Sequence, residues 1–134
     1  MGLMKLISAL TRKSNGRRYE QKVKKYLGKK IVIERTGTIY SYGGKKYYTE
    51  IDIETPSTAI EIKSGKGSGL KKQLDRYSNV TKKEPVALAP NMRYGAKYQT
   101  RKTYKVFDSP KELRKYLLSK GDGKTKRRNW KWTK

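Results

Sequence analysis

The sequence predicts a single α/β domain in which helices flank a mixed central β-sheet. Two kinds of segment alternate along the 134 residues: stretches with apolar residues at helical spacing, and short runs that are alternating or wholly apolar. Glycine- and proline-containing turns separate them. We place the domain at 14–119, between an arm at 1–13 and a basic, flexible tail at 120–134. Leu3–Leu10 in the arm is too short and too charged for a membrane span, and it predicts a small docking helix.

The first predicted element is a helix from the capping residues at 14–16 to about Leu27, with Gly28 as its stop. Its apolar stripe consists of Tyr19, Val23, Tyr26 and Leu27. A strand is predicted over Ile31–Arg35, and Gly43-Gly44 then predicts a hairpin within Tyr40–Tyr48.

Two further strands are predicted within Glu50–Lys63, around the turn Thr55-Pro56-Ser57. Alternation in the first strand puts Glu50, Asp52 and Glu54 on one face and Thr49, Ile51 and Ile53 on the other; in the second strand Ala59, Glu61 and Lys63 share a face. Pairing of these strands brings Asp52 next to Glu61, with Lys63 one pleat further along. Two carboxylates on apolar strands are costly without a cation, so we expect a hard divalent metal there.

The glycine-rich segment Ser64–Gly69 lacks the pattern of a P-loop and predicts a flexible, cationic rim. A helix near Leu70–Asn79 follows, with Leu70, Leu74 and Tyr77 on its inner face. The run Pro85–Pro90 predicts a central strand covered on both faces, and Tyr104–Phe107 predicts another strand. A capping box, Ser109 to Glu112, with proline in between, begins a last helix that buries Leu113, Tyr116 and Leu117.

Composition narrows the function. With 35 Lys and Arg against 11 Asp and Glu, the formal charge is +24, so nucleic acid is the expected partner. The chain has no cysteine and no histidine. These absences exclude disulfides, zinc fingers, thiol nucleophiles and every mechanism based on imidazole. A hydrolase would have to work with carboxylates, lysine, hydroxyls and a metal.

Asp52, eight intervening residues and then Glu61-Ile62-Lys63 resemble the D…ExK signature of the PD-(D/E)xK, or restriction-endonuclease-like, nucleases. Ile51 stands where that family often has proline, and the resemblance spans roughly Ser14 to Leu118. It implies an αβββαβ core with an extra C-terminal strand and helix. It also implies a Mg²⁺- or Mn²⁺-dependent endonuclease, with DNA as the most plausible substrate.

The resemblance also implies roles for individual residues. Asp52, Glu61 and the carbonyl of Ile62 would hold the metal, and Lys63 would orient the attacking water and offset charge in the transition state. Glu20 matches a glutamate on the first helix that helps hold metal in this family. A surface ion pair with Lys24, four residues on, is an equally good alternative. Gln73 matches a glutamine near the metal water, or else faces solvent.

Nucleic-acid contacts are expected from cations around this site and from the tail, where tryptophans stand among basic residues. The candidates are Arg17, Arg18, Lys66, Lys71, Lys72, Arg127, Arg128, Trp130 and Trp132.

The biological role stays open between several readings. Glu84–Leu118 resembles restriction-endonuclease-fold toxin domains of bacterial polymorphic toxins, which implies action in the cytoplasm, possible delivery from another cell and an acidic inhibitor protein. The layout is also similar to small archaeal and viral Holliday-junction resolvases. An RNA-cleaving toxin and a non-catalytic nucleic-acid-binding protein are further alternatives. Because copies at +24 repel one another, we favour a monomer over a dimer.

Overall fold

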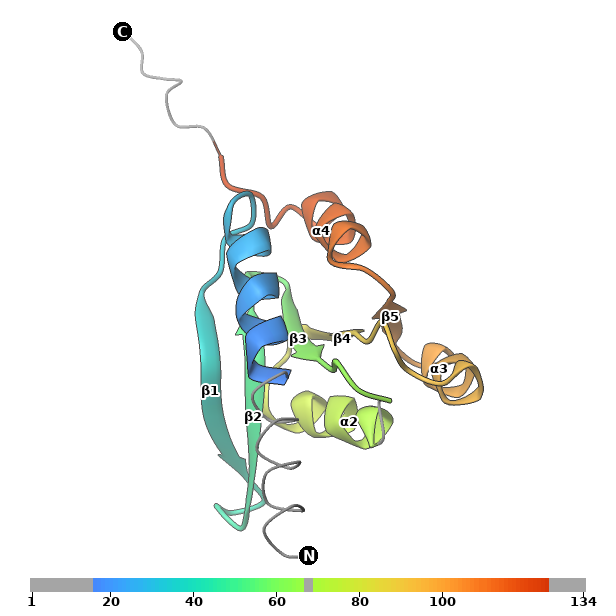
Figure 1. Ribbon diagram of the computed structural model, residues 1–134. Coiled ribbons are helices and arrows are strands. Elements are labelled where there is room, and N and C mark those ends of the chain that lie inside the picture. Colours follow the sequence, from blue (N-terminus) through green and yellow to red (C-terminus); the bar gives the residue numbers. More distant parts are fainter. Residues whose placement is uncertain (1–15, 67–68, 126–134) are drawn as a thin grey trace, which may run out of the picture.

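The computed structural model describes residues 16–66 and 69–125. Within these ranges the chain folds into a five-stranded mixed sheet with four helices, which confirms the predicted α/β class (Figure 1). The elements are a helix over 16–28, β1 (Arg35–Tyr42), β2 (Tyr47–Glu54), β3 (Thr58–Ile62), α2 (Leu70–Val80), β4 (Glu84–Leu88), α3 (Tyr94–Arg101), β5 (Lys105–Phe107) and α4 (Pro110–Ser119). None of the helices in these ranges is long and apolar enough to cross a membrane.

The strands lie in the order β1-β2-β3-β4-β5. The first three form an antiparallel meander, whereas β4 runs parallel to β3 and β5 runs parallel to β4. Parallel neighbours need a crossover connection, and α2 and α3 supply the two crossovers. The carboxyl ends of β3, β4 and β5 therefore share one edge of the sheet, where ligands commonly bind in open α/β sheets.

Two apolar clusters cover the two faces of this sheet. Ile60 packs with Val23 of the first helix and Leu113 of α4, whereas its strand neighbour Ala59 packs with Leu74 of α2. Because consecutive strand residues point to opposite faces, α2 lies on one face of the sheet, and the first helix and α4 lie on the other. The strand β4 contributes buried residues to both clusters, which confirms its predicted central position.

One sequence prediction of local structure is wrong, and one helix is absent from the predicted elements. The predicted strand at Ile31–Arg35 is reduced to a single bridge between Ile31 and Gly123, and β1 begins only at Arg35. The helix α3 was not predicted at all. It buries only Thr100 among its eight residues, so the sequence has no apolar stripe to reveal it.

The predicted alternation also breaks within β2. Ile51 packs in the cluster with Ala59, and Ile53 packs in the opposite cluster with Ile60. The β1–β2 register runs on either side of Gly37 and Asp52 but includes no pair between them, and Gly37 has a positive φ of 58°. The ribbon therefore changes face at Asp52, the residue predicted to be functional. Glycine fits this point because φ near +60° is strained for other residues.

The segment after α4 packs onto the domain, so the predicted flexible tail cannot begin at 120. Asp122 is only 1% exposed, and its Oδ2 accepts hydrogen bonds from Thr55 (2.6 Å) and Ser57 (2.7 Å) in the β2–β3 turn. Its backbone carbonyl accepts from Val32, and Lys124 N–H donates to Lys30 O. Residues 126–134 of the predicted tail, like the arm at 1–13, lie outside the described residues.

Asp122→Ala is expected to lower the free energy of unfolding by about 2–4 kcal/mol, because the buried hydroxyl of Thr55 and the half-buried hydroxyl of Ser57 would both lose their carboxylate acceptor. Chemical denaturation followed by circular dichroism measures this. Asp108→Ala is the matched control, since Asp108 pairs with Lys97 and Arg101 at the surface and its loss should change stability by less than about 1 kcal/mol. Equal effects of the two substitutions would show that Asp122 does not anchor the turn.

Candidate active site

Asp52 and Glu61 meet where β2 and β3 pair. The register Ile53↔Ile60 and Glu54↔Ala59, continued by one step, places Asp52 opposite Glu61. Oδ2 of Asp52 instead accepts the backbone N–H of Ile62 at 2.9 Å, which fixes the carboxylate beside its neighbour. Glu61, 7% exposed, accepts a 2.5 Å hydrogen bond from the hydroxyl of Tyr77 in α2 through Oε1. The predicted juxtaposition of the two carboxylates is present.

Both carboxyl groups carry perturbed pKa values. Burial, together with the negative charge of Glu61, raises the pKa of Asp52 to about 8. Burial also raises the pKa of Glu61, against the opposing effects of the Tyr77 hydrogen bond and the Lys63 charge. The pKa values of both acids are raised although Lys63 is nearby, so its charge does not fully compensate the pair. Groups with such perturbed pKa values cluster at functional sites.

Lys63 follows β3 directly and stands beside the pair. Its Nζ lies 3.7 Å from Oε2 of Glu61, and its backbone N–H is held by Leu88 O at 2.9 Å. The side chain is about one-third exposed and lines a cavity of about 350 Å³ at the sheet edge, together with Glu20 and Arg17. Lys63 can therefore interact both with Glu61 and with a ligand in that cavity.

Glu20 reaches this cavity from the first helix, but Oε2 pairs with Lys24 at 3.0 Å. The surface pair considered for this residue is thus present. Its charge contributes a weaker increase to the pKa of Asp52 and Glu61, after burial and closer groups. Glu20 lies near the pair without completing it: no group of three or more Asp, Glu, His or Cys converges anywhere in 16–66 and 69–125.

Gln73 is turned toward other partners. Its Nε2 donates to Thr49 Oγ1 at 3.0 Å, and its Oε1 accepts from Arg76 at 2.9 Å. Gln73 therefore links α2 to β2 at Thr49, three residues before Asp52, and the described contacts do not connect it to the carboxylates.

Tyr77 is the site residue that sequence reasoning missed. We had assigned it to the apolar stripe of α2, where it is fully buried. A buried tyrosine hydroxyl needs a partner, and that need was the available signal. Burial, followed by the charges of Glu61 and Asp52, raises the pKa of Tyr77 above its usual range, so that the hydroxyl stays protonated and donates to Glu61.

The donor set suits a hard divalent cation. Hydrogen bonds from Ile62 and Tyr77 occupy one oxygen of each carboxylate, which leaves Oδ1 of Asp52 and Oε2 of Glu61. Mg²⁺ is commonly bound by one or two carboxylates, with water in the other positions. A cation between these oxygens would also supply the charge that the raised pKa values show to be missing.

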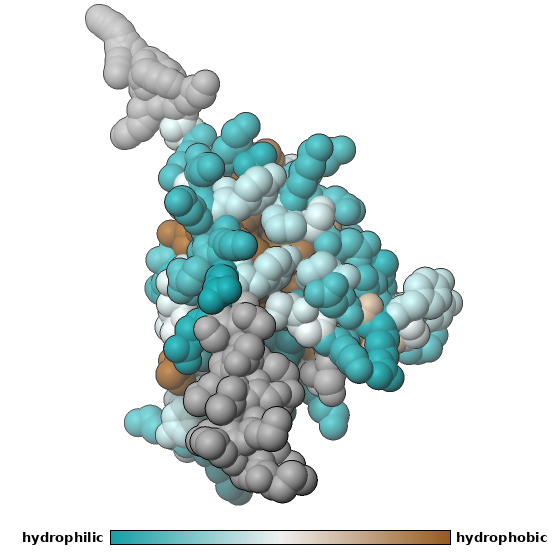
Figure 2. Space-filling view, in the orientation of Figure 1, coloured by the Kyte–Doolittle hydropathy of each residue, from teal (hydrophilic) through white to brown (hydrophobic). Residues whose placement is uncertain are grey.

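The predicted phosphate-binding cations lie around this edge. Arg17 lines the smaller cavity, and Lys66, Lys71 and Lys72 line a larger one; all are exposed, as is Arg18. In the view of Figure 2, hydrophilic residues dominate the described surface. The other candidates, Arg127, Arg128, Trp130 and Trp132, lie outside the described residues.

Comparisons with protein-family models, with curated proteins and with solved structures each found no match. The function of this chain is therefore inferred from its own residues and their geometry.

In metal-free buffer, Asp52→Asn is expected to stabilise the protein at pH 9. An aspartate has a pKa of about 3.9 when unfolded, whereas that of folded Asp52 is about 8. Such a raised pKa gives stability that is complete below the unfolded value and lost as the pH rises through 8. Asparagine removes this loss, so its melting temperature should exceed that of wild type by about 5 °C or more at pH 9 in EDTA.

The same thermal melts at pH 4 are the control, because the advantage of the variant should largely vanish where Asp52 is protonated. Adding Mg²⁺ at pH 9 should raise the melting temperature of wild type more than that of Asp52→Asn. A difference that does not change with pH would contradict the burial of a charged pair.

Proposed function

We propose that this protein is a metal-dependent phosphodiesterase that cleaves nucleic acid internally, with a PD-(D/E)xK-type active site. The observation that carries the proposal is the pair of half-buried Asp52 and buried Glu61, side by side on adjacent strands with Lys63 3.7 Å from Glu61, on a chain of charge +24. The order helix, three strands, helix, strand agrees with the αβββαβ core that this family shares. Asp52 on the second strand and Glu61 with Lys63 at the third match its motif positions.

Asp52, Glu61 and the Ile62 carbonyl are the groups that would hold Mg²⁺ or Mn²⁺. When bound, such an ion polarises a phosphate oxygen and makes water a better nucleophile. The Ile62 N–H keeps Asp52 in one orientation, and Tyr77 does the same for Glu61. Fixed ligands reduce the reorganisation required when substrate binds.

Lys63 supplies a positive charge at the mouth of the cavity, where a phosphodiester would lie. Cleavage builds negative charge on the phosphoryl oxygens, and a preorganised cation stabilises that charge more than it stabilises the ground state. The exposed cations Arg17, Lys66 and Lys71 at the same edge would hold the neighbouring phosphates.

Charge also bears on the partner. A cleaver with this charge would bind any accessible nucleic acid in the cell that makes it, because attraction to phosphate is largely independent of sequence. We propose an acidic protein antagonist that covers the cationic edge. Growth arrest on expression of wild type, but not of an Asp52→Asn variant, would support the need for such a protein.

The proposed function is tested by incubating purified protein with plasmid, single-stranded DNA, a four-way junction and tRNA, in Mg²⁺, in Mn²⁺ and in EDTA. Internal cleavage in either metal, absent in EDTA, is expected. A strong preference for the junction would favour a resolvase, and cleavage of tRNA alone would favour an RNase. Binding without cleavage of any substrate would leave a nucleic-acid-binding protein, and undiminished cleavage in EDTA would exclude the metal mechanism.

A further inference from the structure

A larger cavity opens beside the active site, between α2 and α3. Its volume is about 790 Å³, within the range of about 300–1,000 Å³ that is usual for ligand sites. Four of its ten lining residues are Lys or Arg, and none is acidic. The proposed cleavage chemistry does not use it.

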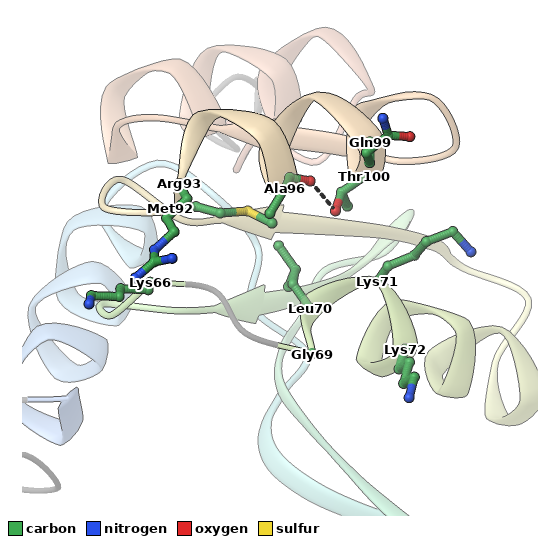
Figure 3. Close-up of a pocket in the computed structure, with 10 residues that line it drawn as sticks. All are labelled: Lys66, Gly69, Leu70, Lys71, Lys72, Met92, Arg93, Ala96, Gln99 and Thr100. Carbon is green, nitrogen blue, oxygen red and sulfur yellow. Dashed lines mark hydrogen bonds between the residues drawn. The ribbon is translucent and has the colours of Figure 1, made fainter.

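The inner wall of the cavity is apolar. Leu70 of α2 points toward Met92 and Ala96 on the α3 side (Figure 3). Ala96 is the exposed member of the three, whereas Leu70 and Met92 are almost completely buried. These three side chains offer no donor to a phosphate or a sugar. Gln99 and Thr100 also line the cavity, and the hydroxyl of Thr100 donates to Ala96 O at 2.8 Å. The faces of nucleobases fit the apolar wall, since bases pack on apolar and thioether groups. In a duplex those faces are covered by stacking, so only an unstacked base could enter.

Cations lie at both ends of the apolar wall. Arg93 and Lys66 lie together at one end, whereas the side chain of Lys71 extends toward the other (Figure 3). Lys71 also pairs with Asp75 at 3.2 Å, at an exposed position where a phosphate could compete. The apolar wall and the flanking cations together suit a nucleotide. Its base would enter the cavity, and its two adjacent phosphates would contact the cations at the cavity entrance.

A hydrogen bond from a side chain to the backbone joins the cavity to the active site. Asn91 Nδ2, one residue before Met92, donates to the carbonyl of Ser64 at 2.8 Å, and Ser64 directly follows Lys63. A nucleic-acid strand that passes Lys63 could therefore continue into the cavity. Beyond it, α3 presents Tyr94 and Tyr98, which are 82% and 55% exposed and one helical turn apart. Exposed tyrosines on a basic helix give further surfaces for stacking.

We propose that the α2–α3 cavity binds an unpaired nucleobase of the strand that is cut, with the adjacent phosphates on Lys71 and Arg93. Single-stranded or locally unpaired nucleic acid is then the preferred substrate class. That the bound strand is also cut rests on the proposed function, whereas binding of a base in the cavity does not depend on it.

Binding is measured in EDTA, where no cleavage is expected, by fluorescence anisotropy with a labelled DNA strand, an RNA strand of the same sequence and the DNA duplex. Ala96→Glu places an anion in the cavity from an exposed helix position, and Ala96→Phe fills the cavity without adding charge. Thr103→Glu is the control, because it adds the same charge at an exposed residue outside the cavity. Both Ala96 variants should bind the single strands about tenfold more weakly than wild type, the scale of one base contact. Thr103→Glu should bind within about threefold of wild type, and duplex binding should not distinguish Ala96→Phe from wild type.

Equal single-strand affinity of Ala96→Phe and wild type, with Ala96→Glu no weaker than Thr103→Glu, would overturn the inference even if wild type cleaves in Mg²⁺. Conversely, an Ala96-specific loss in a protein that cleaves nothing in Mg²⁺ or Mn²⁺ would support the cavity and reject the nuclease.

Discussion

Asp52→Asn and Glu61→Gln are each expected to lower the rate of cleavage by at least about a thousandfold. Each substitution removes one of the two carboxylates that would hold the metal, whose contribution to transition-state stabilisation is several kcal/mol. Because every 1.36 kcal/mol corresponds to a factor of ten, a loss of this size follows directly. Single-turnover cleavage of a labelled strand in Mg²⁺, with enzyme in excess, measures the chemical step.

These substitutions preserve the size of the side chains, so the fold should remain intact. Asp52→Asn is even expected to be the more stable protein in EDTA at high pH, which would separate loss of activity from loss of structure. Binding of a labelled strand in EDTA should stay within a few-fold of wild type, since the phosphate contacts come from lysine and arginine.

Glu50→Gln is the matched control, because Glu50 is an exposed carboxylate on the same strand, two residues before Asp52. It should keep cleavage within about twofold of wild type, as substitutions of surface residues usually have small effects. Full activity in Asp52→Asn, or an equal loss in Glu50→Gln, would mean that the pair is not the catalytic centre.

The carboxylate pair could be anticipated because it depends on local features. The turn at Thr55-Pro56-Ser57 and the two flanking strands are close in sequence, and pairing across a short turn fixes which residues oppose each other. Because both acids stand among apolar residues in the sequence, they are recognisable as candidates for a functional site. The capped start of α4 was predictable for the same reason, since Ser109 accepts the N–H of Glu112 only three residues on.

Features set by distant contacts could not be anticipated. Asp122 accepts hydrogen bonds from Thr55 and Ser57, which precede it by 67 and 65 positions in the sequence. From the sequence alone, Asp122 is simply an acidic residue in a basic segment. The hydroxyl of Tyr77 finds Glu61 only because α2 packs across β3. The change of face at Asp52 depends on Gly37 in another strand. In each case the local sequence is equally compatible with a residue that has no special role, and only tertiary packing determines which contacts form.

Lys63→Ala is expected to lower the single-turnover rate of cleavage by about a hundredfold, comparable to removal of one preorganised transition-state contact. Its Nζ is positioned by Glu61 at 3.7 Å and by a backbone that is fixed to Leu88, so the charge is held in place before substrate arrives. Such a group acts mainly on the transition state, and the loss should appear in kcat rather than in KM. Lys63→Arg should retain part of the rate, because it keeps the charge but changes its geometry.

Lys46→Ala is the control for loss of one positive charge, since Lys46 is exposed in the β1–β2 turn and lines neither cavity. Both variants should weaken binding of a labelled strand in EDTA to a similar small extent, and only Lys63→Ala should slow the chemical step. The opposite pattern, a raised KM with unchanged kcat in Lys63→Ala, would make Lys63 a phosphate-binding cation and not a catalytic one. The buried carboxylate pair would then have to stabilise the transition state without it.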